Sequence, residues 1–242
     1  MSGFVLWKGP SQIDGAPIVV IATEESRNVK TGPMVQTWIL REDVSPLDAV
    51  NSGADASVCG SCIHRGSVVD GHNVGRSCYV TIFQAPRSIW ECYKRGGYDI
   101  ITSTEAMWRL KGKKVRLGAY GNPSAAPLTM WRKALRKAQA QTGYIHNWRD
   151  VAKGWRDLVM ASCDSPADYV DAIAAGYRTF RVRRAGEPLA PREVSCPASE
   201  ESGHKTTCAQ CVACGGLSSK AKVNIAIVVH GARAGNFNLT GV

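Results

Sequence analysis

Cysteines are the residues of this 242-residue chain whose types and spacing best suit chemistry, and four of the nine lie close together. These are Cys196, Cys208, Cys211 and Cys214, and the last three follow a C-x2-C-x2-C spacing. The segment around them is rich in Ser, Thr, Gly and Glu, so it cannot build an apolar core of its own. A thiolate-bound metal can fold such a loop, because the free energy of metal binding becomes free energy of folding.

Two kinds of centre use four cysteines, a tetrahedral zinc ion and an iron–sulfur cluster. Structural zinc sites usually have two C-x2-4-C pairs separated by a longer span. Three cysteines in consecutive two-residue steps are instead typical of the ferredoxin run. We therefore predict a four-iron (4Fe-4S) iron–sulfur cluster as the cofactor of these four cysteines, with zinc as the alternative.

A second group of cysteines lies in the first half of the chain, where Cys59 and Cys62 form a Cys-x-x-Cys pair and Cys78 follows. Histidines lie between them, as in many metal-binding segments. Thioredoxin-like redox chemistry and purely structural cysteines are the alternatives, but the strand–motif–helix context of a redox motif is missing. We predict that all three bind metal. The spacing leaves open whether they join the C-terminal four or form a separate site with His64, Cys92 or Cys163.

The charge of the chain favours a polyanionic partner. Lys and Arg number 30 against 20 Asp and Glu, which gives a net charge of +10, and nucleic acid is the simplest such partner. A predicted helix over residues 128–141 carries basic pairs four residues apart, whose repulsion a phosphate backbone would relieve. We predict that this helix binds nucleic acid through Arg132, Lys133, Arg136 and Lys137. A basic surface without a specific ligand is the alternative.

Length and composition predict one globular α/β domain over residues 1–242, with cysteine-rich metal-binding segments at 55–80 and 194–217. The apolar runs are too short to span a membrane, and the first thirty residues lack the pattern of a signal peptide. The odd number of cysteines also argues against a disulfide scaffold. We therefore expect a soluble protein in the reducing environment of a cytoplasm.

Strands and helices alternate along most of the chain, and the strands are nearly continuous apolar runs. This pattern predicts parallel β/α units, arranged as a complete or partial (β/α) barrel, with an open doubly wound sheet as the alternative. The strands are expected over 17–22, 34–40, 115–121, 142–148, 157–162, 177–182 and 223–231. The helices are expected over 46–53, 88–96, 103–112, 128–141 and 165–176.

In a β/α barrel the working residues lie at the C-terminal ends of the strands. This rule selects four candidate catalytic residues, namely Asn122, His146, Asp164 and His230. Either histidine would serve as a metal ligand or proton shuttle, and Asn122 and Asp164 would orient them or a substrate. Ordinary turn chemistry is the alternative for each residue taken singly.

The order of several short motifs resembles a known group of proteins. The motifs are Cys59-x-x-Cys62 with Cys78-Tyr79, residues 120–123, residues 143–148, and Cys196-Pro with Cys208-x-x-Cys211-x-x-Cys214. Together they resemble cysteine-rich bacteriophage and plasmid proteins related to the mycobacteriophage gene-product-88 family. The resemblance implies a phage-encoded protein that acts in a bacterial host cytoplasm, with a barrel similar to that of radical-SAM enzymes. The chain departs from those enzymes because it has no C-x3-C-x2-C loop.

These observations support three hypotheses of function. The first is a phage-type iron–sulfur protein with a basic surface for nucleic acid. The second is a radical-SAM-like or other metal-dependent enzyme that acts on a small substrate. The third is a zinc-stapled structural protein or one that binds a host bacterial protein.

Overall fold

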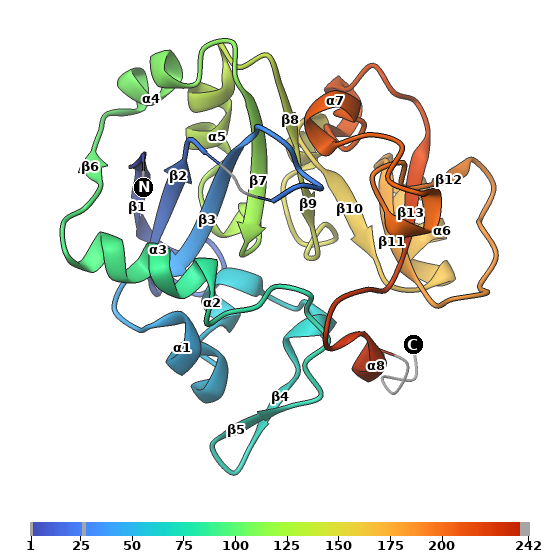
Figure 1. Cartoon of the computed structure of the whole chain (residues 1–242), viewed down its shortest axis with the longest axis horizontal. Coiled ribbons are helices and arrows are strands. Elements are labelled where there is room, and N and C mark those ends of the chain that lie inside the picture. Colours follow the sequence, from blue (N-terminus) through green and yellow to red (C-terminus); the bar gives the residue numbers. More distant parts are fainter. Residues whose placement is uncertain (1, 26–27, 238–242) are drawn as a thin grey trace.

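The computed structural model describes residues 2–25 and 28–237 as a mixed α/β molecule with two main sheets (Figure 1). The strand order is β6-β1-β2-β3-β7-β8 in the first sheet and β12-β13-β11-β10-β9 in the second. Strands β1, β2 and β3 pair antiparallel, whereas the pairs from β3 to β8 and throughout the second sheet are parallel. A separate hairpin of β4 and β5 projects beyond both sheets.

The elements have the following bounds. The first sheet contains β1 (Gly3–Pro10), β2 (Pro17–Thr23), β3 (Val35–Arg41), β6 (Asp99–Ile100), β7 (Lys114–Tyr120) and β8 (Ala140–Thr142). The second contains β9 (Tyr144–Ile145), β10 (Met160–Cys163), β11 (Thr179–Arg183), β12 (Glu193–Ser195) and β13 (Asn224–Val228), and the hairpin contains β4 (Ser67–Val69) and β5 (His72–Val74). The helices are α1 (Pro46–Ser52), α2 (Ala56–Cys59), α3 (Ala85–Lys94), α4 (Ser103–Arg109), α5 (Leu128–Leu135), α6 (Pro166–Ala174), α7 (Cys208–Cys211) and α8 (Ala234–Phe237). Short 3₁₀ turns lie at Ile63–Arg65, Pro123–Ala125, Lys153–Asp157, Glu200–Ser202 and Gly216–Ser218.

The two sheets meet at Gly143, the single residue between β8 and β9. Its carbonyl oxygen accepts a hydrogen bond from the backbone N–H of Met160, and its own N–H donates to the carbonyl of Cys214. A Cβ atom at this position would lie 2.9 Å from Cβ of Leu117 and 3.1 Å from Cγ1 of Val159. The chain therefore passes from one sheet to the other at a point that has no room for a side chain.

Local sequence signals set several helix ends. Ser45 accepts a hydrogen bond from the backbone N–H of Asp48 at the start of α1, and Gly53 ends that helix with a φ of 80°. Ser165 caps α6 in the same way, and Pro166 occupies its first turn. These side chains satisfy backbone donors that have no partner within the helix. The predicted limits of both helices are confirmed to within a residue or two.

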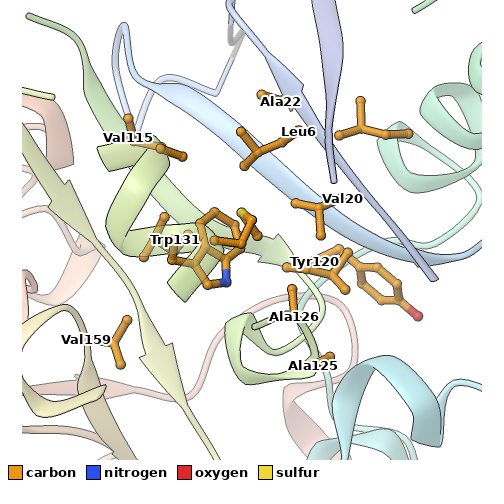
Figure 2. Packing of buried hydrophobic residues seen from close by; sticks show 14 of the residues in the cluster. Leu6, Val20, Ala22, Val115, Tyr120, Ala125, Ala126, Trp131 and Val159 are labelled. Atoms are coloured by element: carbon orange, nitrogen blue, oxygen red, sulfur yellow. The ribbon is translucent and has the colours of Figure 1, made fainter. Parts of the chain in front are cut away.

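A large apolar core joins the first sheet to the helices and to the start of the second sheet. Figure 2 shows Trp131 of α5 at its centre, among side chains from the strands and the turn at 123–125. Trp131 is fully buried, and its indole N–H donates to the carbonyl of Pro123. A smaller core belongs to the second sheet and includes Met160, Phe180, Ile225 and Ile227.

The predicted mixed α/β fold with mostly parallel strands is confirmed. The described strands form two separate sheets with edges at β6 and β8 and at β9 and β12, so their pairing does not show a barrel. None of the described helices has the length and apolarity that a membrane-spanning helix needs.

Several predicted bounds are wrong. The helix expected over 128–141 ends at Leu135, because residues 140–142 pair with β7 as strand β8. The helix expected from 88 begins at Ala85. The strand expected over 157–162 is Met160–Cys163, preceded by a 3₁₀ turn. Strands β1, β6 and β12 and the hairpin of β4 and β5 were not predicted from the sequence.

Candidate metal and ligand site

One cavity of about 300 Å³ brings together most of the residues that the sequence analysis selected. Alternate residues of the parallel strands line it, for example Phe180 and Val182 of β11 and Ile225 and Ile227 of β13. Successive side chains of a strand point to opposite faces, so this period of two places the cavity on one face of the second sheet. Helix α6 packs against β10 and β11.

The four C-terminal cysteines all line this cavity. Cys196 follows β12, and its N–H donates to the carbonyl of Ala226. Cys208 and Cys211 begin and end α7, which Thr207 caps. The N–H of Cys208 donates to the carbonyl of Lys30, which fastens the loop to the segment before β3. The four cysteines predicted to bind one cofactor thus reach the same cavity from two segments, the end of β12 and the α7 loop.

Positive charges surround these four thiols. Lys30 and Arg116 line the cavity beside them, and the guanidinium of Arg178 donates to backbone carbonyls of the same loop, at Ala213 and Gly216. Burial raises the pKa of the Cys214 thiol, and the neighbouring cysteine thiolates raise this pKa further. Burial also lowers the pKa of the Lys30 amine, although the thiolates nearby oppose this. Four thiolates here would thus meet cations that offset their charge.

The N-terminal cysteine group reaches the same cavity. Cys62 and Cys78 line it, whereas Cys59, at the end of α2, packs against the large core. Burial raises the pKa of Cys59, and the neighbouring charges of Asp55, Cys62 and Cys78 raise it further, so the three cysteines lie within electrostatic range of one another. The sequence left open whether the two cysteine groups lie together. In the structure, both groups contribute residues to the lining of one cavity.

A chain of polar contacts leads from Cys62 into the protein. Nε2 of His146 lies 3.4 Å from Sγ of Cys62, and Nδ1 of His146 lies 3.6 Å from Oδ2 of Asp164. The other carboxylate oxygen of Asp164 lies 2.9 Å from Nε2 of His64, whose Nδ1 is 2.8 Å from Oγ of Ser77. His146 and Asp164 follow neighbouring strands, as the strand-end rule predicts.

The charged groups in this series of contacts stabilise each other's ionised forms. Burial by itself would lower the pKa of His146, but the Cys62 thiolate and the Asp164 carboxylate raise this pKa well above its ordinary value. Burial opposes ionisation of Asp164, yet hydrogen bonds with His146 and His64 lower the pKa of this carboxyl group. The arrangement suits an imidazolium that lies between the Cys62 sulfur and the Asp164 carboxylate.

The other two candidate catalytic residues, His230 and Asn122, lie apart from the contacts of His146 and Asp164. His230 lines the cavity, where its ring stacks on Tyr79 and its Nε2 lies 3.4 Å from Nζ of Lys30. Burial and the charge of Lys30 lower the pKa of His230. Asn122 does not line the cavity; its side chain caps the turn at Pro123–Ala125 and donates to Asn147. The turn-chemistry alternative therefore accounts for Asn122.

Two further cysteines, like Cys59, lie outside the cavity lining. Cys163 is buried in the large core, and Cys92 of α3 packs against the same core beside Gly97. Among the ligands considered for a separate site with Cys59, Cys62 and Cys78, only His64 lines the cavity, and it contacts Asp164 instead of a thiol.

Sequence reasoning missed the aromatic and basic side chains of the cavity wall. Nη2 of Arg116 donates to the hydroxyl groups of Tyr79, at 2.7 Å, and Tyr144, at 3.2 Å. Tyr144 stacks on Phe180. Tyr79 and Tyr144 lie in two of the short motifs of the sequence, but those motifs assigned them no role, and the period of two in β7 was the only signal for Arg116.

Most of the predicted nucleic-acid residues have partners within the chain. Arg132 pairs with Asp157 at 3.1 Å, Arg136 contacts the sulfur of Met107, and Lys137 lies over the ring of Trp108. Lys133 is exposed. These contacts supply part of the compensation that the sequence analysis assigned to an acidic partner, and nucleic-acid binding stays a prediction.

Within residues 2–25 and 28–237, no group of three or more His, Cys, Asp or Glu side chains is placed to hold a metal ion. The cysteine groups therefore line the cavity without converging on one point. A comparison of the chain with protein-family models, curated proteins and solved structures finds no match.

Proposed function

We propose that this chain is an iron–sulfur protein that holds a four-iron cluster through Cys196, Cys208, Cys211 and Cys214. The observation that carries the proposal is that all four thiols line one cavity beside Lys30 and Arg116, although eleven residues separate Cys196 from Cys208. Thiolates are the usual ligands of such clusters. We also propose that the strands from β3 to β13 form a partial barrel around the cavity.

The placement of the thiols favours a cluster over zinc. A tetrahedral zinc ion with Zn–S bonds of about 2.3 Å brings its sulfur ligands within about 3.8 Å of each other. The cysteines are not gathered this closely around one point. A cluster is larger than a single ion, so its ligands stand farther apart and surround a volume such as this cavity.

The neighbouring cations support the same proposal. A cluster with four thiolate ligands carries net negative charge, which is costly to bury without nearby positive groups. Lys30, Arg116 and Arg178 provide such groups, and Arg178 also fixes the loop that carries Cys211 and Cys214. The cluster would supply electron-transfer or Lewis-acid chemistry, while these residues would set its charge environment and its exposure to water.

The test is the metal and sulfide content of protein purified without oxygen. We expect at least about four iron and four acid-labile sulfide per chain, with a broad absorption near roughly 400 nm. Replacement of all four cysteines by serine removes this iron and sulfide, whereas Cys92→Ala, outside the cavity lining, leaves both unchanged. Zinc without sulfide in the wild-type protein would instead support the zinc-stapled alternative.

A metal-dependent enzyme that acts on a small molecule is the second candidate function. The observation in its favour is the cavity itself, whose volume lies at the lower limit of ordinary ligand pockets and whose wall carries Lys30, Arg116 and His230. Two cations favour an anionic substrate. The radical-SAM-like form of this candidate is tested by incubating the reduced protein with S-adenosylmethionine and separating the products by chromatography. If S-adenosylmethionine is not cleaved, this form of the candidate is rejected.

A further inference from the structure

We propose that Cys62 is the nucleophile of an acyl-transfer site in the same cavity, that His146 moves its proton, and that the substrate is an ester or thioester of a small apolar acyl group. The site uses none of the four C-terminal cysteines, so it does not rest on the proposed cluster. Three features of the structure support it: the contacts of the thiol, their position in the fold, and the cavity beside them.

The first feature is the series of contacts behind the thiol. Nε2 of His146 lies 3.4 Å from Sγ of Cys62, and Nδ1 of the same ring lies 3.6 Å from Oδ2 of Asp164. A nucleophile beside a histidine that a third polar group orients is the usual arrangement for nucleophilic catalysis. Such contacts are often long in a free enzyme and shorten when substrate binds. Cys62 therefore has both the base and the orienting carboxylate that this chemistry needs.

The carboxylate is itself held in place. Oδ1 of Asp164 lies 2.9 Å from Nε2 of His64, and Nδ1 of His64 lies 2.8 Å from Oγ of Ser77. The exposed fraction falls along the series, from 21% for the side chain of His146 to 8% for that of Asp164. Cys62 and His146 line the cavity and are the catalytic residues, whereas Asp164 does not line it and is a positioning residue.

The second feature is the position of these contacts in the fold. His146 and Asp164 follow β9 and β10, which are parallel neighbours in the second sheet. Ligands of open α/β sheets bind outside the carboxyl ends of the strands. Cys62 reaches this edge from a segment 84 residues away from His146, and its carbonyl oxygen accepts a hydrogen bond from the N–H of Arg65 in the turn that follows. Three separate segments thus supply the three groups, so local turn chemistry does not account for their contact.

The third feature is the cavity of about 300 Å³ beside the thiol. Cys62 and His146 both line it and neither is fully buried, so a bound molecule can contact them. Lys30 and Arg116 lie within electrostatic range of Cys214, among the C-terminal cysteines. The wall also carries large apolar side chains, namely Phe180, Val182, Ile225 and Ile227. A wall of this kind favours a short hydrocarbon group on the substrate.

The reaction has two steps. In the first, the proton of Cys62 is held at Nε2 of His146 while the sulfur attacks the carbonyl carbon of the substrate. The carbon–sulfur bond forms, the bond to the leaving oxygen or sulfur breaks, and His146 gives the proton to the departing alcohol or thiol. In the second, a water molecule attacks the thioester and gives a proton to His146, which returns it to Cys62 as the carboxylic acid leaves. Water is the only co-reactant, and neither step is an oxidation or a reduction.

The test uses the full-length protein and para-nitrophenyl butyrate. We expect a burst of about one para-nitrophenolate per chain from Cys62, because a covalent intermediate accumulates before it is hydrolysed. Mass spectrometry of the digested protein is expected to find a butyryl group on the peptide that contains Cys62. Cys62→Ala lowers the burst by this one equivalent. Because the acyl group is located by peptide, reaction of other cysteines does not affect the result, with or without a bound cluster.

Variants separate the roles of the two side chains behind the thiol. His146→Gln is expected to slow the acylation of Cys62 about 100-fold or more, as loss of general acid–base catalysis does. Added imidazole should restore part of the rate in His146→Ala. Asp164→Asn should slow acylation as well, and Asp164→Glu, which keeps a carboxylate, should restore part of that loss. His72→Ala is the matched control, because His72 is exposed on β5, and it leaves the rate unchanged.

The chain length of the ester tests the substrate class. Each rate is divided by the rate of the same ester with free cysteine, which corrects for intrinsic reactivity. Burial of two further methylene groups against the apolar wall is expected to favour the butyrate over the acetate ester by about 10-fold. Equal corrected rates would reject an apolar acyl group as the substrate.

Two results would overturn the acyl-transfer site itself. One is a wild-type protein whose Cys62 peptide carries no acyl group after incubation with either ester. The other is an unchanged rate of Cys62 acylation in a folded His146 variant. If neither His146 variant folds, as judged by circular dichroism, the wild-type protein decides. Acylation of Cys62 faster than that of free cysteine at the same pH then supports the proposal, and an equal or slower rate rejects it.

Discussion

Arg178 offers the sharpest test of how the cysteine loop is held. It is 6% exposed, and its guanidinium donates to the carbonyls of Ala213 at 2.8 Å, Gly216 at 2.9 Å and Val223 at 3.1 Å. The substitution Arg178→Ala leaves these carbonyls without their donor in a buried place. Hydrogen bonds to a charged group contribute about 1.5 to 3 kcal/mol each and are not additive, so we expect a loss of about 3 to 5 kcal/mol.

Thermal unfolding of the purified protein, followed by circular dichroism, measures this loss. For a chain of this size, 1 kcal/mol shifts Tm by about 2 to 4 °C, so Tm is expected to fall by about 10 °C. If the proposed cluster is bound, its iron content should fall together with Tm, because the loop carries Cys211 and Cys214. Arg178→Lys keeps the charge without the fork of donors and is expected to have an intermediate effect.

Arg156→Ala is the matched control. Arg156 also donates to two backbone carbonyls, those of Lys153 and Ala175, but at the surface. Water replaces its hydrogen bonds when the side chain is removed, so the expected loss is below about 1 kcal/mol. Equal Tm values for the Arg178→Ala and Arg156→Ala variants would refute the reasoning that burial makes the Arg178 contacts important.

Three other predictions concern the joint between the sheets, the pH dependence and the basic surface. Gly143→Ala should destabilise the protein by about 1 to 3 kcal/mol through overpacking, whereas Gly235→Ala, where a Cβ meets nothing within 4 Å, should not; urea unfolding compares them. Contacts with Lys113 and Ser2 lower the pKa of Glu24 to about 2, so its stabilisation is present above pH 4.5 and is lost as the pH falls toward 2. After discounting for solvent, Glu24→Gln should cost about 1 kcal/mol at pH 7 and almost nothing near pH 2, and a constant difference across that range would contradict this. If the basic surface binds nucleic acid, the affinity should fall steeply with salt, and Lys133→Ala should reduce the salt slope by about 1 in a fluorescence titration.

The sequence predicts those elements whose ends are marked by local chemistry. Ser45 and Gly53 bound α1, and Ser165 with Pro166 begins α6, because caps and stops act within a few residues. The end of α5 was not predictable in this way. Residues 140–142 continue an acceptable helical pattern, but their pairing with β7 stabilises a strand instead.

The residues of the candidate site were predictable from the sequence, but their arrangement was not. The spacing of the cysteines selected seven, of which all but Cys59 line the cavity, and the strand-end rule selected both His146 and Asp164, which are in contact. The union of the two cysteine groups depends on contacts between residues more than 80 positions apart, such as Cys62 and His146. No local pattern carries that information. The aromatic and basic wall was missed for the same reason.

The position of β13 has a consequence for the order in which the protein matures on the ribosome. This strand is the last of the described strands, yet it lies between β11 and β12, so the second sheet cannot be completed until residues 224–228 have left the ribosome. Cys78 is synthesised 118 residues before Cys196, which at about 5 to 20 residues per second is a delay of roughly 6 to 24 s. During that interval the early thiols lack the wall that later encloses them, and a nascent chain is exposed to oxidation or to the wrong metal. If the protein binds the proposed cluster, insertion of the cluster should therefore follow release of the chain from the ribosome.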